Sequence, residues 1–167
     1  MKKFAFVFLL IFIAKLSAQS LVSYVNPFVG TKNMGHTFPG ATAPFGMVQL
    51  SPETKQVPYM KDGKYNGETY RYCSGYQYND STIFGFSHTH FSGVGHSDLG
   101  DFLMMPTTGK LNLEPGEAGK PKSGYHSQFS KNTEHANPGF YEVMLDDYGI
   151  KAELTATERV GFHRYTD

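Results

Sequence analysis

The sequence is short of several features that would assign its class directly. Its 167 residues include no tryptophan and a single cysteine, Cys73, so no disulfide bond can form within the chain, and we interpret this thiol as buried and inert. The 15 basic residues are balanced by 15 acidic ones. Proteins that bind nucleic acids need a concentration of positive charge, which this composition does not supply. We therefore expect neither an internal disulfide nor a nucleic-acid partner.

The sequence also lacks a hydrophobic run long enough to span a membrane. The apolar stretch at residues 4–14 is interrupted at Lys15 and falls short of the roughly 20 residues that a transmembrane helix needs. It follows two lysines and precedes Ala18, an order that is typical of a secretory signal peptide. We predict that residues 1–18 are a signal peptide, and that the mature protein is exported to the periplasm or beyond the cell without a membrane attachment.

Helical periodicity is missing as well, whereas the features of β structure are abundant. The 11 tyrosines and 14 phenylalanines favour strands, and the 18 glycines and 9 prolines divide the chain into short segments. Alternating apolar and polar residues predict an antiparallel meander over residues 139–145, 150–157 and 162–165. Further short strands are predicted at residues 47–50, 83–86, 102–106, 110–113 and 124–130. The predicted fold is an all-β antiparallel β-sandwich, formed by one domain over residues 19–167.

The last alternating stretch has only begun when the sequence ends at Asp167. A sheet that stopped there would have a short last strand and an open edge. We therefore expect that the domain is incomplete at its C-terminal end, and that the chain is the N-terminal piece of a longer protein.

The polar stretch at residues 73–101 is the main candidate for a site. It surrounds a short apolar run with polar side chains, and the ends of a buried strand are common places for functional residues. His88 and His90 are separated by one residue, a spacing that lets two imidazoles face the same side of a strand. They can be read as zinc ligands, with His96 or Asp98 as a third ligand. Alternatively, one histidine is hydrogen-bonded within the loop and the other faces a cleft.

Aromatic residues and one more histidine lie near this stretch. Tyr72, Tyr76 and Tyr78 alternate, and tyrosine rings can stack on sugars, but packing in a core explains the same pattern. His36 lies in a loop rich in glycine and proline, where a surface position and a ligand contact are both open. The residues by themselves predict an exported β-sandwich with a polar, histidine-rich loop site.

Several sequence blocks follow one another in an order that points to a known family. They are residues 26–31 (NPFVGT), 35–41 (GHTFPGA), 44–52 (PFGMVQLSP), 73–76 (CSGY), 85–90 (GFSHTH), 146–150 (DDYGI) and 153–163 (ELTATERVGFH). Together they resemble the N-terminal domain of family 92 of the glycoside hydrolases, over nearly all of the chain after residue 18. One departure is visible, because many members carry tryptophan just before the CSGY block, where this sequence has Arg71 and Tyr72.

The resemblance implies an exported, calcium-dependent, exo-acting α-mannosidase that hydrolyses α-mannosides with inversion of the anomeric configuration. It also implies an N-terminal β-sandwich joined to a larger (α/α)6 barrel, with the active site between the two. The catalytic acid and base and most of the calcium ligands belong to the barrel. We therefore assign no catalytic residue and no metal ligand to this chain, which is expected to be inactive alone. The implied partners are an α-mannose-containing glycan and the barrel domain.

By the same resemblance, loops of this domain close one wall of the sugar pocket. The substrate-binding residues that it suggests are His36, Tyr76, Asp80, His88, His90 and His96. These side chains would exchange hydrogen bonds with mannose hydroxyls. Two other interpretations are kept: a free-standing carbohydrate-binding β-sandwich, and a zinc hydrolase with histidine ligands.

Overall fold

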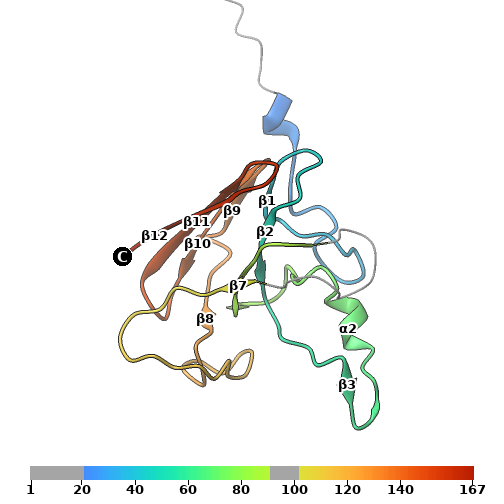
Figure 1. Cartoon of the computed structure of the whole chain (residues 1–167), viewed down its shortest axis with the longest axis vertical. Coiled ribbons are helices and arrows are strands. Elements are labelled where there is room, and N and C mark those ends of the chain that lie inside the picture. The colour runs from blue at the N-terminus through green and yellow to red at the C-terminus, as the bar shows by residue number, and fades with distance from the viewer. Residues whose placement is uncertain (1–20, 91–101) are drawn as a thin grey trace, which may run out of the picture.

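Two four-stranded antiparallel sheets dominate the computed structural model, which describes residues 21–90 and 102–167 (Figure 1). We call them the N-terminal sheet and the C-terminal sheet. The N-terminal sheet has the order β1 (Ala41–Thr42), β2 (Gln49–Glu53), β6 (Gly85–Ser87), β7 (Leu103–Met104). The C-terminal sheet has the order β12 (Gly161–Thr166), β11 (Ile150–Ala156), β10 (Phe140–Leu145), β9 (His135–Asn137).

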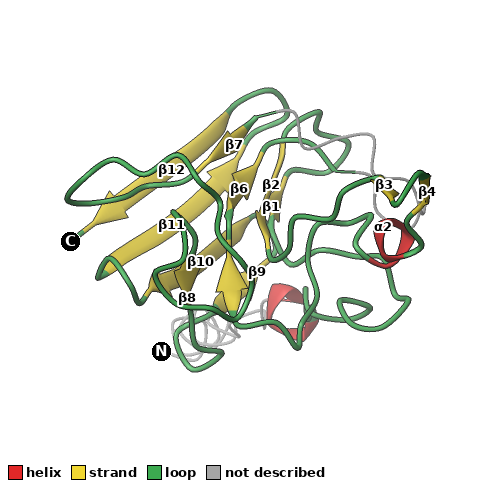
Figure 2. Cartoon of the chain, turned by 90° about the horizontal axis from the view of Figure 1, so that it is seen from below, coloured by secondary structure: helices red, strands yellow, loops and turns green. Residues whose placement is uncertain are grey.

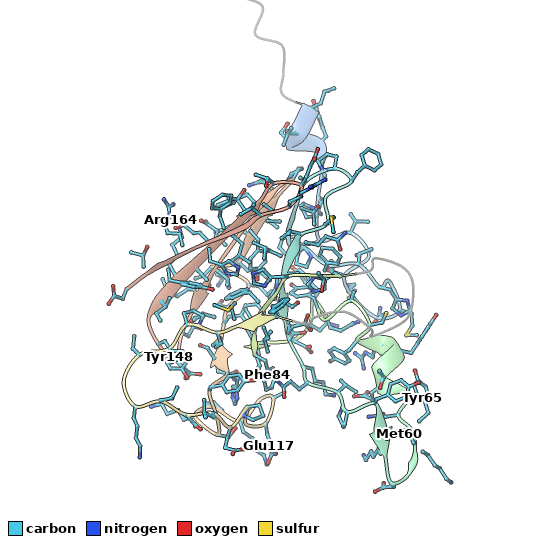
Figure 3. All side chains as sticks on the ribbon, viewed as in Figure 1. Met60, Tyr65, Phe84, Glu117, Tyr148 and Arg164 are labelled. Atoms are coloured by element: carbon cyan, nitrogen blue, oxygen red, sulfur yellow. The ribbon has the colours of Figure 1, made fainter. Side chains whose placement is uncertain are left out.

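The C-terminal sheet is the predicted meander. Alternate residues of β10 are buried, and β11 repeats the pattern from Ile150. The buried residues pair across the two strands, with Tyr141 opposite Leu154 and Val143 opposite Ala152. A strand whose side chains alternate in this way buries one face and leaves the other in solvent. On the outer face, Arg164 of β12 binds Glu153 of β11 with two hydrogen bonds of 2.6 and 2.7 Å (Figure 3).

The two sheets share one hydrophobic core, which confirms the predicted β-sandwich. Its buried residues are Ala41, Leu50, Ile83, Phe86, Phe129, Tyr141, Val143, Leu145, Ile150, Ala152 and Leu154. Leu50 and Phe86 come from the N-terminal sheet, and the ring of Phe86 lies 6.4 Å from the ring of Tyr141 in the C-terminal sheet. Sheets packed face to face in this way interleave the side chains of their inner faces.

Smaller elements lie beside the sandwich. They are η1 (Leu21–Tyr24), the β3 (Met60–Lys61) and β4 (Lys64–Tyr65) hairpin, α2 (Glu68–Arg71), and the pair β5 (Thr82–Ile83) and β8 (Ser127–Gln128). Figure 2 shows α2 and the β3–β4 hairpin together on one side of the molecule, away from the strands of the sandwich. Met60 and Tyr65 sit on this projecting hairpin (Figure 3). The dipeptide Asn66-Gly67, which by itself favours a tight turn, leads into α2 instead.

The strand predicted at residues 83–86 is broken in two. Ile83 pairs with β8, whereas Phe86 pairs with β2 and β7. Between them the Phe84 amide donates a 2.8 Å hydrogen bond to the Glu53 carbonyl, and Gly85 adopts a φ of +152°, which is rarely accessible to other residues. The short run therefore belongs to two sheets, and Gly85 at the start of β6 lies opposite Glu53 at the end of β2.

Other strand predictions are wrong in part or in full. The strand predicted at residues 47–50 runs over Gln49–Glu53, and within residues 124–130 only Ser127 and Gln128 form a strand. Within residues 102–106 only Leu103 and Met104 form a strand, and Met104 is exposed rather than buried. Residues 110–113 form no strand, and Leu111 and Leu113 are 72% and 77% exposed. Alternation in sequence makes a strand only where a neighbouring strand offers hydrogen bonds.

Two expectations concern residues outside the described ranges and stay predictions. The signal peptide proposed for residues 1–18 lies outside the described residues, as do His96 and Asp98. In the ranges 21–90 and 102–167, no helix has the length and apolar character to cross a membrane.

Candidate functional site

A pocket of about 330 Å³ lies beside β2 and β6, and we call it the Glu53 pocket. Its lining includes Glu53, Lys55, Tyr72 and His90. The antiparallel register pairs Ser51 with Ser87 and puts the residues that follow β6 beside Gln49, at the start of β2. The His90 side chain then meets the Glu53 carboxylate, which comes from the other end of β2. Concave sites with a few convergent polar groups are the usual form of small-molecule sites.

Three polar side chains meet at the base of this pocket. Ser87 Oγ donates a 2.5 Å hydrogen bond to Glu53 Oε1, and His90 Nε2 lies 2.8 Å from Ser87 Oγ and 3.0 Å from Glu53 Oε1. His90 Nδ1 lies 2.8 Å from the Gln49 carbonyl oxygen. A carbonyl and a carboxylate only accept hydrogen bonds, so both contacts are satisfied when each ring nitrogen carries a hydrogen. The cluster is then a charge-assisted network.

The network is arranged for binding rather than for nucleophilic attack. Ser87 is fully buried, so its hydroxyl cannot reach a substrate, although it contacts a histidine and a carboxylate. The His90 side chain is only 3% exposed, whereas that of Glu53 is 20% exposed. The ring of Phe38 also lies 4.5 Å from the His90 ring and covers it. Glu53 is thus the member of the cluster that offers a charged acceptor to the pocket, and the other two hold it in place.

Asp80 lies at a neighbouring pocket of about 300 Å³, which we call the Asp80 pocket and which shares Lys55 and Tyr72 with the Glu53 pocket. Thr54 Oγ1 donates a 2.8 Å hydrogen bond to Asp80 Oδ2, and the Tyr72 hydroxyl donates a 3.3 Å one to Oδ1. Burial, followed by the negative charge of Asp80, raises the pKa of the Tyr72 hydroxyl, which therefore stays protonated as a donor. The structure thus brings Asp80 and His90 to adjacent hollows.

Tyr76 is placed in the interior instead. It is fully buried, and its hydroxyl donates to Glu134, which also accepts hydrogen bonds from Tyr141 at 2.7 Å and from Lys131 at 2.9 Å. Burial lowers the pKa of Lys131, whose ammonium also lies 4.4 Å from the centre of the Phe129 ring. Tyr76 has no exposed surface for a sugar, and its contacts connect the loop after α2 to the C-terminal sheet.

His36 is buried as well, so the surface position considered for it is wrong. Its ring meets the edge of the Tyr70 ring at 4.5 Å, and its backbone φ is +55°, an uncommon value for a residue with a side chain. Among the described residues no group forms a hydrogen bond with His36 Nε2. A buried polar atom of this kind usually acquires a partner from water or from a ligand.

His88 turns away from His90. Its Nδ1 lies 3.0 Å from the Phe102 carbonyl oxygen, and its Nε2 lies 3.1 Å from Nε2 of His163 on β12. β6 ends at Ser87, so the same-side geometry of a continuous strand does not apply to the two histidines. In the part of the chain that the structure describes, no three histidine, cysteine or acidic side chains converge as metal ligands.

Glu53, Ser87 and His163 were missed as candidates. Glu53 carries no local signature, because only the register of β2 against β6 places it beside Ser87 and His90. Ser87 lies three positions before His90, within the stretch that was examined. A signal for His163 did exist, since alternation along residues 162–165 sets it on the opposite face from Phe162.

Comparison with known proteins assigns the chain to a family. The model of the glycosyl hydrolase family 92 N-terminal domain matches residues 24–166. The structure of the family 92 α-mannosidase BT3965 from Bacteroides thetaiotaomicron, solved in complex with mannoimidazole, aligns with a TM-score of 0.78 and 48% identity, over 89% of this chain and 18% of that one. The family 92 glycosyl hydrolase ccman5 aligns with a TM-score of 0.65 and 34% identity, over 87% and 18%.

A secreted glycosidase of uncharacterised function from Arthroderma benhamiae is 29% identical over 160 residues, which are 93% of this chain and 19% of that protein. The chain therefore spans less than a fifth of the length of these relatives. It belongs to the glycoside hydrolase family 92 N-terminal domains, as the order of its sequence blocks implied.

Proposed function

We propose that this chain is the N-terminal part of an exo-acting α-mannosidase that hydrolyses α-mannosides with inversion. The observation that carries the proposal is the match of residues 24–166 to the family 92 N-terminal domain, together with 48% identity to a family 92 α-mannosidase. The catalytic acid and base are proposed to lie outside this chain, in the barrel domain. An inverting hydrolysis needs two carboxyl groups separated by enough room for a water molecule.

In this proposal the chain contributes one wall of the sugar pocket through the Glu53 and Asp80 pockets. Two features support that role: the partly exposed Glu53 carboxylate and the nearby Asp80 carboxylate, which the Tyr72 hydroxyl holds by a hydrogen bond. Carboxylates accept hydrogen bonds from sugar hydroxyls. His88 lines neither of these two pockets, and its proposed contact with the substrate rests on the family resemblance.

Calcium dependence is proposed for the complete enzyme on the basis of the family alone. Calcium takes six to eight oxygen ligands, largely from carboxylates and carbonyls. Among the described residues, Glu53 is engaged by Ser87 and His90, and Asp80 by Thr54 and Tyr72. These carboxylates do not fit a calcium site, and no calcium ligand is assigned to residues 21–90 or 102–167.

Export is proposed from the signal-peptide pattern at residues 1–18 and from the relative that is described as secreted. The mature enzyme would then meet α-mannose-containing glycans outside the cytoplasm.

The test is an assay of the full-length protein on an aryl α-mannoside, with and without a calcium chelator. We expect activity that the chelator removes and that added Ca²⁺, but not Zn²⁺, restores. NMR of the first product should show β-mannose, the inverted anomer. Absence of activity, or activity that chelation does not change, would contradict the proposal. If residues 19–167 alone stayed monomeric and bound mannan while the full-length protein was inactive, the carbohydrate-binding interpretation would replace it.

A further inference from the structure

His88 and His163 form a contact that the sugar pocket does not explain. The two residues are 75 positions apart, since His88 follows β6 of the N-terminal sheet and His163 lies on β12 of the C-terminal sheet. Their Nε2 atoms nevertheless lie 3.1 Å apart, and their ring centroids lie 4.9 Å apart with 27° between the ring planes. Both side chains are partly exposed. The Tyr165 hydroxyl lies 2.7 Å from His163 Nδ1, and the Phe102 carbonyl lies 3.0 Å from His88 Nδ1. Each ring is thus held at Nδ1 and presents Nε2 to the other.

The hydrogen positions leave a lone pair between the rings. The Phe102 carbonyl only accepts, so the hydrogen of a neutral His88 is on Nδ1 and its Nε2 carries a lone pair. A neutral His163 carries one hydrogen, on Nδ1 or on Nε2. Tyr165 can donate to His163 Nδ1 or accept from it. In the first case His163 Nε2 donates a hydrogen bond to the lone pair of His88 Nε2. In the second case two lone pairs face each other, and a shared cation offsets their repulsion.

The spacing matches the requirement of a transition-metal ion. Two imidazole nitrogens that bind one Zn²⁺ at 2.0–2.1 Å with a tetrahedral angle are separated by about 3.3 Å. A histidine that binds a metal usually donates its other N–H to a carbonyl or another acceptor. His88 has this arrangement with Phe102, and His163 has it with Tyr165 in the tautomer that carries hydrogen on Nδ1.

We propose that His88 and His163 form a two-histidine site for a transition-metal ion such as Zn²⁺, with its other coordination positions open to water. The ion binds between the two Nε2 atoms, and the His163 hydrogen moves to Nδ1, where the Tyr165 oxygen accepts it. No proton is released in this step. Because the described residues supply two ligands here, we expect a dissociation constant in the micromolar to submillimolar range. The site lies apart from the Glu53 pocket and differs from calcium sites in using nitrogen donors.

The experiment is a Zn²⁺ titration of the full-length protein at pH 7.5, with Ca²⁺ in excess so that oxygen-lined sites are filled. We expect one saturable Zn²⁺ per chain, with affinity reduced at least tenfold in His88→Ala and in His163→Ala. His135→Ala, which removes an exposed histidine on β9, is the matched control and should bind as the parent does. Equal binding by His163→Ala and the parent, or no saturable binding by the parent up to 1 mM Zn²⁺ (about the weakest affinity of a specific site), would overturn the proposal.

A measurement on the unmodified protein covers the case in which the variants do not fold. X-ray absorption at the zinc edge should show two imidazole nitrogens about 2.0 Å from the metal. A spectrum with oxygen ligands only would overturn the proposal. This outcome is independent of the α-mannosidase assay, because Zn²⁺ binding does not require catalytic activity.

Discussion

The two sheets of the sandwich are built in different ways. The C-terminal sheet joins strands that follow one another in sequence, and β10 and β11 pair over six residues each. The N-terminal sheet joins short strands from distant parts of the chain, and β2 pairs with β6 over three residues. Neighbouring strands need little loop-closure entropy to meet, whereas distant strands depend on the rest of the fold. The C-terminal sheet is therefore a scaffold, and the N-terminal sheet is where separate segments are brought together.

The inner faces of the two sheets also differ in polarity. The inner face of β10 and β11 is mostly apolar, with Tyr141 held by Glu134 at its edge. The N-terminal sheet buries Ser87 and His90 against Glu53. Buried polar groups weaken a core unless they are fully hydrogen-bonded, so their concentration near one sheet edge is typical of a site. Four predictions test this contrast.

The largest expected effect is on the scaffold. Leu154→Ala should lower the free energy of unfolding by about 2–5 kcal/mol, because it leaves a cavity in a fully buried part of β11. Denaturant unfolding of the full-length protein measures this. Phe162→Ala, which truncates an exposed side chain on the next strand, should change stability by no more than about 0.5 kcal/mol. If the two variants were equally stable, the C-terminal sheet would not be the main source of stability.

The second-largest expected effect is the loss of the hydrogen bond from Tyr76 to Glu134, which connects the loop after α2 to the C-terminal sheet. Tyr76→Phe removes a donor from the buried Glu134 and should cost about 1–3 kcal/mol in stability. The KM for an aryl α-mannoside should stay the same, because Tyr76 is not exposed. Tyr78→Phe, at a partly exposed position, is the control and should leave stability nearly unchanged. A raised KM with unchanged stability would give Tyr76 the direct sugar contact that the family resemblance suggested.

A smaller effect is expected at the Glu53 pocket. Glu53→Gln keeps the shape of the side chain and removes its charge, so we expect KM to rise about tenfold, equivalent to about 1.4 kcal/mol of binding. Glu117→Gln is the control, because Glu117 (Figure 3) is exposed and lines neither the Glu53 pocket nor the Asp80 pocket. Melting temperatures of both variants show whether the fold is intact. An unchanged KM in a folded Glu53→Gln protein would exclude this carboxylate from the sugar pocket.

The smallest effect is a pH dependence at the junction of the sheets. The pKa of His163 is about 4 in the folded protein, against an ordinary value of 6.5. Between these values the unfolded chain binds a proton that the folded protein does not, so stability rises with pH. This contribution is complete above pH 6.5 and is lost as pH falls toward 4. Melting temperatures across that range should fall less steeply in His163→Gln than in the parent or in His135→Gln, and parallel curves would contradict the shift.

Sequence alone accounted for much of the scaffold. The alternation over residues 139–145 and 150–157 was sufficient to predict β10 and β11, because each strand pairs with its neighbour. The same rule failed at residues 110–113, where no strand lies alongside, and at residues 83–86, where Gly85 lets the chain change partners. The order of the sequence blocks predicted the family, which the match over residues 24–166 confirmed.

The candidate site was predicted only in part. Asp80 and His90 do lie at adjacent pockets, whereas Tyr76 and His36 are buried and His88 joins a different cluster. Ser87 is a local partner of His90, but Glu53 is 37 positions from His90 and His163 is 75 positions from His88. No local pattern encodes such distances.

By itself, the sequence determined the class of fold, the family and the antiparallel meander, because these depend on local alternation and on ordered motifs. Only the tertiary structure decided which polar side chains meet. The register of β2 against β6 set Glu53 beside His90, and the packing of β12 set His163 against His88. These contacts connect strands that are distant in sequence, so they exist only once the two sheets have packed together.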